Sequence, residues 1–147
     1  MPAVSRHEPY PASNFLVEID GVPVKGSFSE VSGIQAESDP IEYREGTDPD
    51  SVVHKLPGVR KFSNIVLKRG IVGDLTLWNW MQNTLQGTVQ RASMAVILLD
   101  ENQNQVMRWK FIRAWPCKWN GPTLNAKSHE VAIETLEICH EGLEIET

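Results

Sequence analysis

Alternating apolar and polar positions dominate the chain and predict a protein built mainly from β-strands. The pattern begins at residues 15–19, where Phe15, Val17 and Ile19 share one face of a strand that ends at the turn Asp20-Gly21. Further strands are predicted over about residues 24–34, 41–44, 61–69, 93–99, 106–113 and 128–140. Glycine and small polar residues interrupt the second of these, which is typical of a bulged or strongly bent strand.

One segment carries helical periodicity instead. Residues 75–86 are expected to form the only helix, with Asp74 as its N-cap and Gly87 just past its end. An apolar stripe is expected along this helix at Leu75, Trp78, Met81 and Leu85.

The connections are short except for one polar stretch at residues 45–58. Turn residues mark it at Asp48-Pro49-Asp50 and at Pro57-Gly58, so we expect a long loop. Loops of this length in small domains are often functional. The stretch at 100–104 between two predicted strands reads as a hairpin turn.

The domain organisation is simple, with a flexible arm at residues 1–13 and a single domain at 14–147. No repeat or linker is present in the sequence. An open antiparallel sheet has unpaired edge strands, which must be covered or paired with another chain. Pairing with identical copies gives rings or filaments when the contact is head-to-tail.

Composition narrows the possible functions. The 147 residues are 41% hydrophobic and 22% charged, and the net charge of −5 argues against a nucleic-acid-binding surface. The two cysteines cannot form a disulfide framework, and no signal-peptide or membrane-spanning run occurs. We therefore expect synthesis in the cytoplasm and, for any export, a route without a signal peptide.

Candidate chemical groups are few, and each has a structural alternative. An inert buried thiol is favoured over a reactive one for Cys117, and Cys139 and His140 should point to opposite faces of a strand. Turn formation by Asp48 and Asp50 is favoured over calcium binding. Core packing of the five tryptophans is favoured over base stacking. No enzyme activity, metal or cofactor is expected.

Several segments in order resemble the tail-tube family of contractile phages and phage-derived contractile injection systems. The resemblance covers nearly all of residues 14–146. Its carriers are Phe15-Leu-Val-Glu-Ile19, Gly26-Ser-Phe-Ser-Glu-Val-Ser-Gly-Ile34, Ile41-Glu-Tyr-Arg-Glu-Gly46, Lys55-Leu-Pro-Gly58, and Ile65-Val-Leu-Lys-Arg-Gly70 followed by Trp78 and Trp80. The Tyr10-Pro11 segment ahead of the first strand looks more like the antifeeding-prophage type of extracellular injection system than a phage virion.

The resemblance implies a mainly β fold, in which two packed antiparallel sheets form a small sandwich or barrel with one flanking α-helix. It also implies hexameric rings that stack into a hollow tube inside a contractile sheath, within a phage tail-like particle. The expected partners are other copies of the chain, the sheath protein, baseplate or tube-initiator proteins, cap proteins, and cargo in the lumen.

The segment from Arg44 to Arg60 resembles the extended loop that reaches neighbouring subunits in the family. The expected inter-subunit contact residues are Arg44, Glu45, Asp48, Asp50, His54, Lys55, Leu56 and Arg60, with Lys68 and Arg69 at a strand end near the ring interface. The polar faces of strands near residues 25–31, 61–68 and 128–137 are expected to line the lumen.

Two other functions remain open at this point. The chain could be a low-copy tube initiator at the baseplate, although its compact length favours the main tube. It could also be a stand-alone binding or effector protein that is secreted through a related machine.

Overall fold

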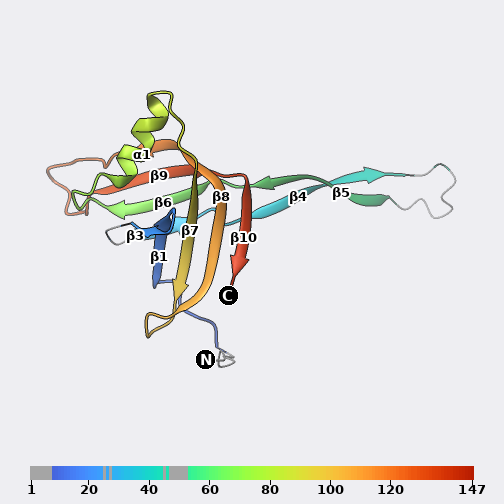
Figure 1. Ribbon diagram of the computed structural model, residues 1–147, viewed down its shortest axis with the longest axis horizontal. Coiled ribbons are helices and arrows are strands. Elements are labelled where there is room, and N and C mark those ends of the chain that lie inside the picture. Colours follow the sequence, from blue (N-terminus) through green and yellow to red (C-terminus); the bar gives the residue numbers. More distant parts are fainter. Residues whose placement is uncertain (1–7, 25, 27, 45, 47–52) are drawn as a thin grey trace.

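The computed structural model describes residues 8–24, 26, 28–44, 46 and 53–147. It has a body of two crossing β-layers with one helix above them, and a long two-stranded ribbon that projects from one side (Figure 1). The predicted mainly β fold with one helix is therefore confirmed.

The first layer, sheet A, contains short strand β2 (Val22–Pro23), then β1 (Phe15–Ile19), β7 (Ala92–Leu99), the first half of β8 (Gln105–Asn120) and β10 (Gly142–Glu146). All of its neighbouring strands are antiparallel. Asp20 and Gly21 both have positive φ, at 51° and 79°, as the tight turn between β1 and β2 requires. The predicted hairpin of residues 93–113 is the pair β7 and β8.

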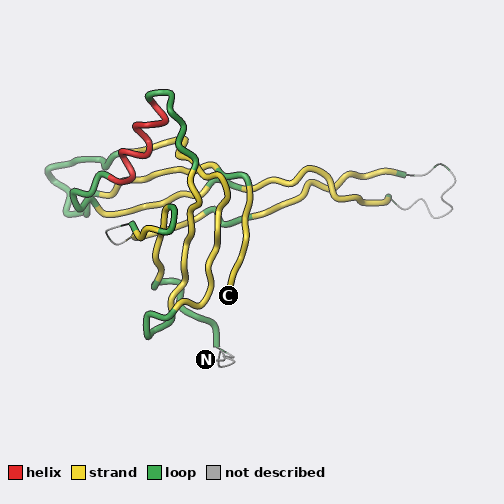
Figure 2. The backbone as a smooth tube through the Cα atoms, viewed as in Figure 1, coloured by secondary structure: helices red, strands yellow, loops and turns green. Residues whose placement is uncertain are grey.

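The second layer, sheet B, contains the second half of β8, β9 (Ile133–Cys139), β6 (Ile65–Gly70) and β3 (Phe28–Ser32). Strand β8 belongs to both layers because register shifts and the positive φ of Arg113 bend it between its two halves. The backbone trace shows the layers running across one another (Figure 2). The predicted pair of packed antiparallel sheets is confirmed, and the described strands follow an open path that does not close into a barrel within the single chain.

The core lies between the inner faces of the two sheets and the helix α1 (Thr76–Leu85). Its fully buried aliphatic and aromatic side chains include Val17, Met94, Val96 and Phe111 from sheet A, Ile65, Leu67, Leu136 and Ile138 from sheet B, and Leu77 from α1. Alternation along each strand puts these residues on one face, as the sequence predicts.

The helix packs on a face rotated from the predicted one. Met81 of the expected stripe is buried and Trp78 is half-buried, but Leu75 and Leu85 are 59% and 64% exposed, whereas Leu77 and Trp80 are buried. The apolar residues of this segment cover a wide arc of the helix, so periodicity alone could not choose which part of the arc is buried. The packing of α1 against β8 determines which of these residues are buried.

The helix ends as predicted but begins differently. Gly87 has a φ of 87°, its N–H donates to Thr84 O at 3.1 Å, and the N–H of Thr88 donates to Asn83 O at 2.9 Å, which is a glycine-terminated helix end. Asp74 is not the N-cap, because no side chain caps this helix. Its carboxylate instead accepts hydrogen bonds from Arg69 and Thr76.

The ribbon consists of β4 (Ala36–Tyr43) and β5 (His54–Phe62), which pair with each other and with no other described strand. The predicted loop at 45–58 is therefore wrong from His54 onward. Pro57 lies opposite Pro40 in the ribbon, and prolines are tolerated there because both strands are edges. Gly58 sits in a bulge where an added Cβ would lie 2.3 Å from Asp39 O.

Other strand boundaries also differ from the predictions, since β4 begins at Ala36 rather than 41 and β8 continues to Asn120 rather than 113. The predicted strand at 24–34 is divided, since Gly26 has a φ of 93° and β3 begins only at Phe28. The predicted strand at 61–69 is broken between β5 and β6. The predicted strand at 128–140 is ordered as a strand only from Ile133.

Candidate functional site, an exposed ribbon and open sheet edges

The outer half of the ribbon presents one apolar face to solvent. Ile41 lies directly opposite Leu56, and Tyr43 opposite His54, so these four side chains share a face. The rings of Tyr43 and His54 stack with centroids 5.3 Å apart. Ile41 is 53% exposed, Leu56 48% and Tyr43 40%. An isolated two-stranded ribbon is marginally stable in water, so a partner that covers this face would stabilise it.

The other face and the inner half of the ribbon are charged. Glu42 lies opposite Lys55, and Glu37 opposite Lys61. Lys61 Nζ is 2.6 Å from Asp39 Oδ2, and this hydrogen bond, together with the charge of Asp39, raises the pKa of Lys61. The ribbon is therefore amphipathic in its outer half, as expected for a segment that lies on another protein surface.

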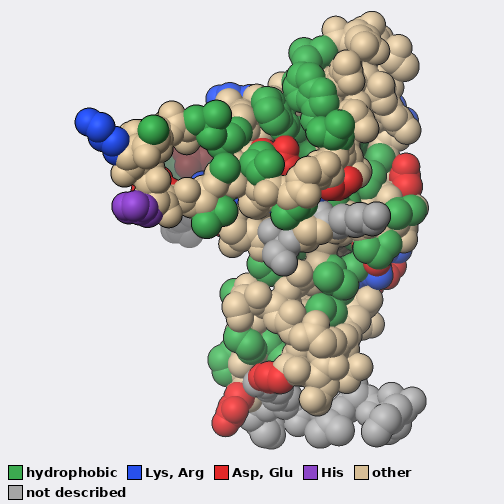
Figure 3. Space-filling view, turned by 90° about the vertical axis from the view of Figure 1, so that its left-hand side faces the viewer, with side chains coloured by type: hydrophobic (Ala, Val, Ile, Leu, Met, Phe, Trp, Pro, Cys, Tyr) green, Lys and Arg blue, Asp and Glu red, His purple; other side chains and the backbone are tan. Residues whose placement is uncertain are grey.

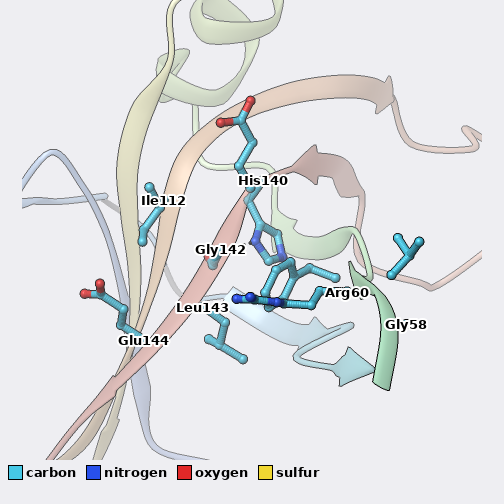
Figure 4. A pocket seen from close by; sticks show the side chains of 10 residues that line it. Gly58, Arg60, Ile112, His140, Gly142, Leu143 and Glu144 are labelled. Carbon is cyan, nitrogen blue, oxygen red and sulfur yellow. Dashed lines mark hydrogen bonds between the residues drawn. The ribbon is translucent and has the colours of Figure 1, made fainter. Parts of the chain in front are cut away.

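A groove of about 820 Å³ opens where the ribbon leaves the body (Figure 4). Arg60 and Phe62 of β5 form one side, and Leu143 and Glu144 of β10 form the other. His140 lies in the groove with its ring nitrogens 3.0 Å from Gly142 O and from Ser63 O. The root of the ribbon is thus held to the body beside the edge of β10.

Sheet A has a polar outer face with several ion pairs. Arg108 Nη1 is 2.7 Å from Glu18 Oε2, and Lys110 Nζ is 2.7 Å from Glu146 Oε1. Among the described strands, β10 pairs only with β8, so its other edge is open, and the opposite side of the sheet ends at the two-residue strand β2. Open edges on both sides make this sheet able to continue into neighbouring chains.

Most of the predicted contact residues that the structure describes lie on or beside the ribbon. Arg44, His54, Lys55, Leu56 and Arg60 are exposed. Glu45, Asp48 and Asp50 lie outside the described residues.

Two predicted contact residues lie on β6 rather than on the ribbon. Lys68 is half-buried, and its Nζ lies 3.1 Å from Glu30 Oε2. Arg69 is fully buried within the chain, so we remove it from the expected inter-subunit residues.

Arg69 instead lies at the centre of a buried network that sequence analysis missed. Its Nε and Nη2 donate to Glu134 Oε1 at 2.9 and 2.6 Å, and its Nη1 donates to Asp74 Oδ2 at 2.9 Å. Trp119 Nε1 donates to the other oxygen of Glu134 at 3.2 Å. The network joins β6, β9, β8 and the segment before α1. Alternation could have revealed it, because Arg69 follows Ile65 and Leu67 on the core face of its strand.

Because of this network, the free energy of unfolding depends on pH in the acid range. Burial acts to raise the pKa of Asp74, but hydrogen bonds from Arg69 and Thr76 and the guanidinium charge outweigh it, and the pKa lies below its ordinary 3.8. A carboxyl with a lowered pKa stabilises the fold above its ordinary pKa, and this contribution is lost as pH falls through the folded-state value.

We expect Asp74→Asn to lower the free energy of unfolding by about 1–3 kcal/mol at neutral pH. The difference from wild type should shrink below about pH 3.8. Urea unfolding of both proteins over this range measures it. An equal difference at every pH would contradict the assignment, and Glu130→Gln, at an exposed carboxylate away from the network, provides a control.

No catalytic constellation is present in the part of the chain that the structure describes. No group of three or more His, Cys, Asp or Glu side chains there is arranged to hold a metal ion. Burial and the nearby Cys139 and Glu137 raise the pKa of the Cys117 thiol to about 12, which leaves it largely protonated and unreactive. None of the described helices is both long and apolar enough to cross a membrane.

A folded body with an exposed amphipathic ribbon and open sheet edges is typical of a structural protein that contacts other chains. The family model of the T4-like virus tail tube protein gp19 matches residues 11–144. The chain therefore belongs to this tail tube family, which is a family of structural proteins. No curated protein matches the sequence significantly.

Solved structures of related particles share the fold. A chain of the extended sheath–tube complex of the PVC extracellular contractile injection system is 24% identical, with a TM-score of 0.85 over 95% of this chain and 93% of that one. A chain of the anti-feeding prophage cap is 26% identical, with a TM-score of 0.86 over 99% and 96%. Hcp1 from Flavobacterium johnsoniae is 18% identical, with a TM-score of 0.63 over 90% and 94%.

Proposed function

We propose that this chain is the main structural subunit of the inner tube of a contractile injection system. Copies join into hexameric rings, and the rings stack inside a contractile sheath. The observation that carries this proposal is the exposed ribbon, whose outer half leaves Ile41, Tyr43 and Leu56 uncovered on one face. Membership of the tail tube family supports the same role.

We further propose that sheet A forms the inner wall, rather than the segments expected from the sequence. The edge of β10 in one copy would continue the sheet at the β1 and β2 side of the next. The face with the Glu18–Arg108 and Lys110–Glu146 pairs would then line the lumen. Paired charges of both signs give a hydrated wall without a strong field for one type of cargo.

The sheath protein, the baseplate and the cap are the proposed partners. The structures that resemble the chain come from sheath–tube, cap and baseplate complexes of such particles. The proposal also includes synthesis in the cytoplasm and assembly into a phage tail-like particle that can be released from the cell.

A low-copy role at one end of the tube is the second candidate. It rests on the likeness to the anti-feeding prophage cap and baseplate chains, which are 26% and 25% identical to this chain. A stand-alone secreted protein has less support, since its ribbon would remain uncovered.

Quantitative mass spectrometry of sheathed particles distinguishes these roles. For the main tube, we expect as many copies of this chain as of the sheath subunit in pelleted particles. A few copies per particle would indicate the low-copy role, and absence from the pellet would reject both.

Charge reversal on the ribbon tests its part in assembly. We expect Lys55→Glu to reduce incorporation into particles, because each exposed contact contributes about 0.5 kcal/mol and recurs in every subunit. Lys127→Glu, also at an exposed position but outside the ribbon, should assemble normally. Equal incorporation of the two variants, measured by particle yield, would remove Lys55 from the interface.

A further inference from the structure

A second apolar surface lies at the end of the molecule away from the ribbon. The pocket has a volume of about 340 Å³ between the end of β6, the start of α1 and the end of β8. Trp78 and Trp119 form one wall, with their rings in an edge contact at 5.0 Å. Ile71 and Leu75 form the rim and are 46% and 59% exposed.

Figure 3 views the molecule from the end that carries this pocket. Hydrophobic side chains gather in the upper half of this end, with a few acidic ones among them (Figure 3). The ribbon leaves the body on the opposite side, next to the open edge of β10 (Figure 1). If a second copy is placed beside that edge, the end of the second copy that carries the pocket therefore faces the ribbon of the first.

We infer that this pocket receives the apolar face of the ribbon from a second copy of the chain. The inference rests on the proposed tube function and names the acceptor site within it. Head-to-tail contact requires a donor and an acceptor at opposite ends of one subunit, and the ribbon and pocket meet that requirement. Ile41 and Leu56 are the donor residues, and Leu75, Trp78 and Trp119 are the acceptor residues.

The charges of the two surfaces are also complementary. Asp74 and Glu134 border the pocket, and Arg69 pairs with both, so two carboxylates and one guanidinium leave this cluster with a net charge of −1. In the outer half of the ribbon, Glu42 lies opposite Lys55, and Arg44 follows the end of β4, so these three described charges sum to +1. This positive charge beside a cluster with a net charge of −1 favours the apolar contact.

Two leucines at the two ends of α1, Leu75 directly before it and Leu85 as its last residue, give a matched test. Leu75 lies on the pocket rim and Leu85 outside the pocket, and they are 59% and 64% exposed. In producer cells, Leu75→Asp should reduce incorporation into particles by about tenfold or more, because an unpaired carboxylate in an apolar contact is costly. Incorporation of Leu85→Asp should equal that of the wild type or fall by less than that of Leu75→Asp. Circular dichroism of both purified chains checks that they fold.

Cross-linking of assembled particles tests the contact itself. A Leu56→Cys and Leu75→Cys chain, treated with a short bismaleimide, should give ladders of linked chains on a denaturing gel. The control pair is Asn102→Cys with Leu75→Cys, since Asn102 is exposed in the turn between β7 and β8, outside the ribbon and the sheet edges. Particles that contain the chain but give no ladder with the first pair would overturn the pocket as acceptor and leave the tube function standing. Absence of the wild-type chain from particles would reject the tube function.

Discussion

Replacing Arg69 by methionine should lower the free energy of unfolding by about 3–5 kcal/mol, the largest effect that we expect from a single substitution. The substitution removes the cationic partner of Glu134, a residue that is only 5% exposed, and leaves its carboxylate charge buried with Trp119 as hydrogen-bond donor. Most domains are stable by only about 5–15 kcal/mol, so this loss is a large part of the total. Urea unfolding followed by tryptophan fluorescence measures it.

Two control variants separate the buried charge from a general loss of packing. Removing both charges with Arg69→Met and Glu134→Met should recover part of the stability, because no isolated charge then remains at Glu134. Lys110→Met breaks the exposed pair with Glu146 and should cost less than about 1 kcal/mol. A cost for Arg69→Met no larger than that for Lys110→Met would show that the buried network contributes little.

The second large effect concerns assembly rather than stability. Changing Ile41 and Leu56 together to threonine should abolish tube assembly, because burying each of these side chains contributes about 1.5–3 kcal/mol per contact. Threonine keeps the strand preference of the ribbon, so β4 and β5 should still pair. The free energy of unfolding of the body should change by less than about 0.5 kcal/mol. Particle yield and urea unfolding measure the two quantities.

The control for this double variant is Val59→Thr in the same ribbon. Val59 is 68% exposed and lies in the bulge of β5, beside the groove at the root of the ribbon. Val59→Thr particles should form at the wild-type yield. Normal tubes from the double variant would show that the apolar face of the ribbon makes no essential contact.

Local sequence patterns determined much of the fold. Alternation placed Val17, Leu67 and Phe111 on core faces, and turn residues gave the hairpin between β7 and β8. Gly87 marked the end of the helix because its backbone needs a positive φ. The motifs along residues 14–146 indicated the tail tube family, which the family model confirms. Each of these signals depends on residues that are close together in the chain.

Only the tertiary structure decided which surfaces became core and which stayed exposed. The apolar residues of the 75–85 segment cover a wide arc, and packing against β8 determined that Leu77 is buried and Leu75 is available at the pocket rim. The Lys55-Leu-Pro-Gly58 segment carries turn residues, yet pairing with β4 makes it a strand. The partners of Arg69 come from Asp74 and from Glu134, which is 65 residues away. Local propensity cannot fix such choices, because their free energies arise from contacts between segments that are distant in sequence.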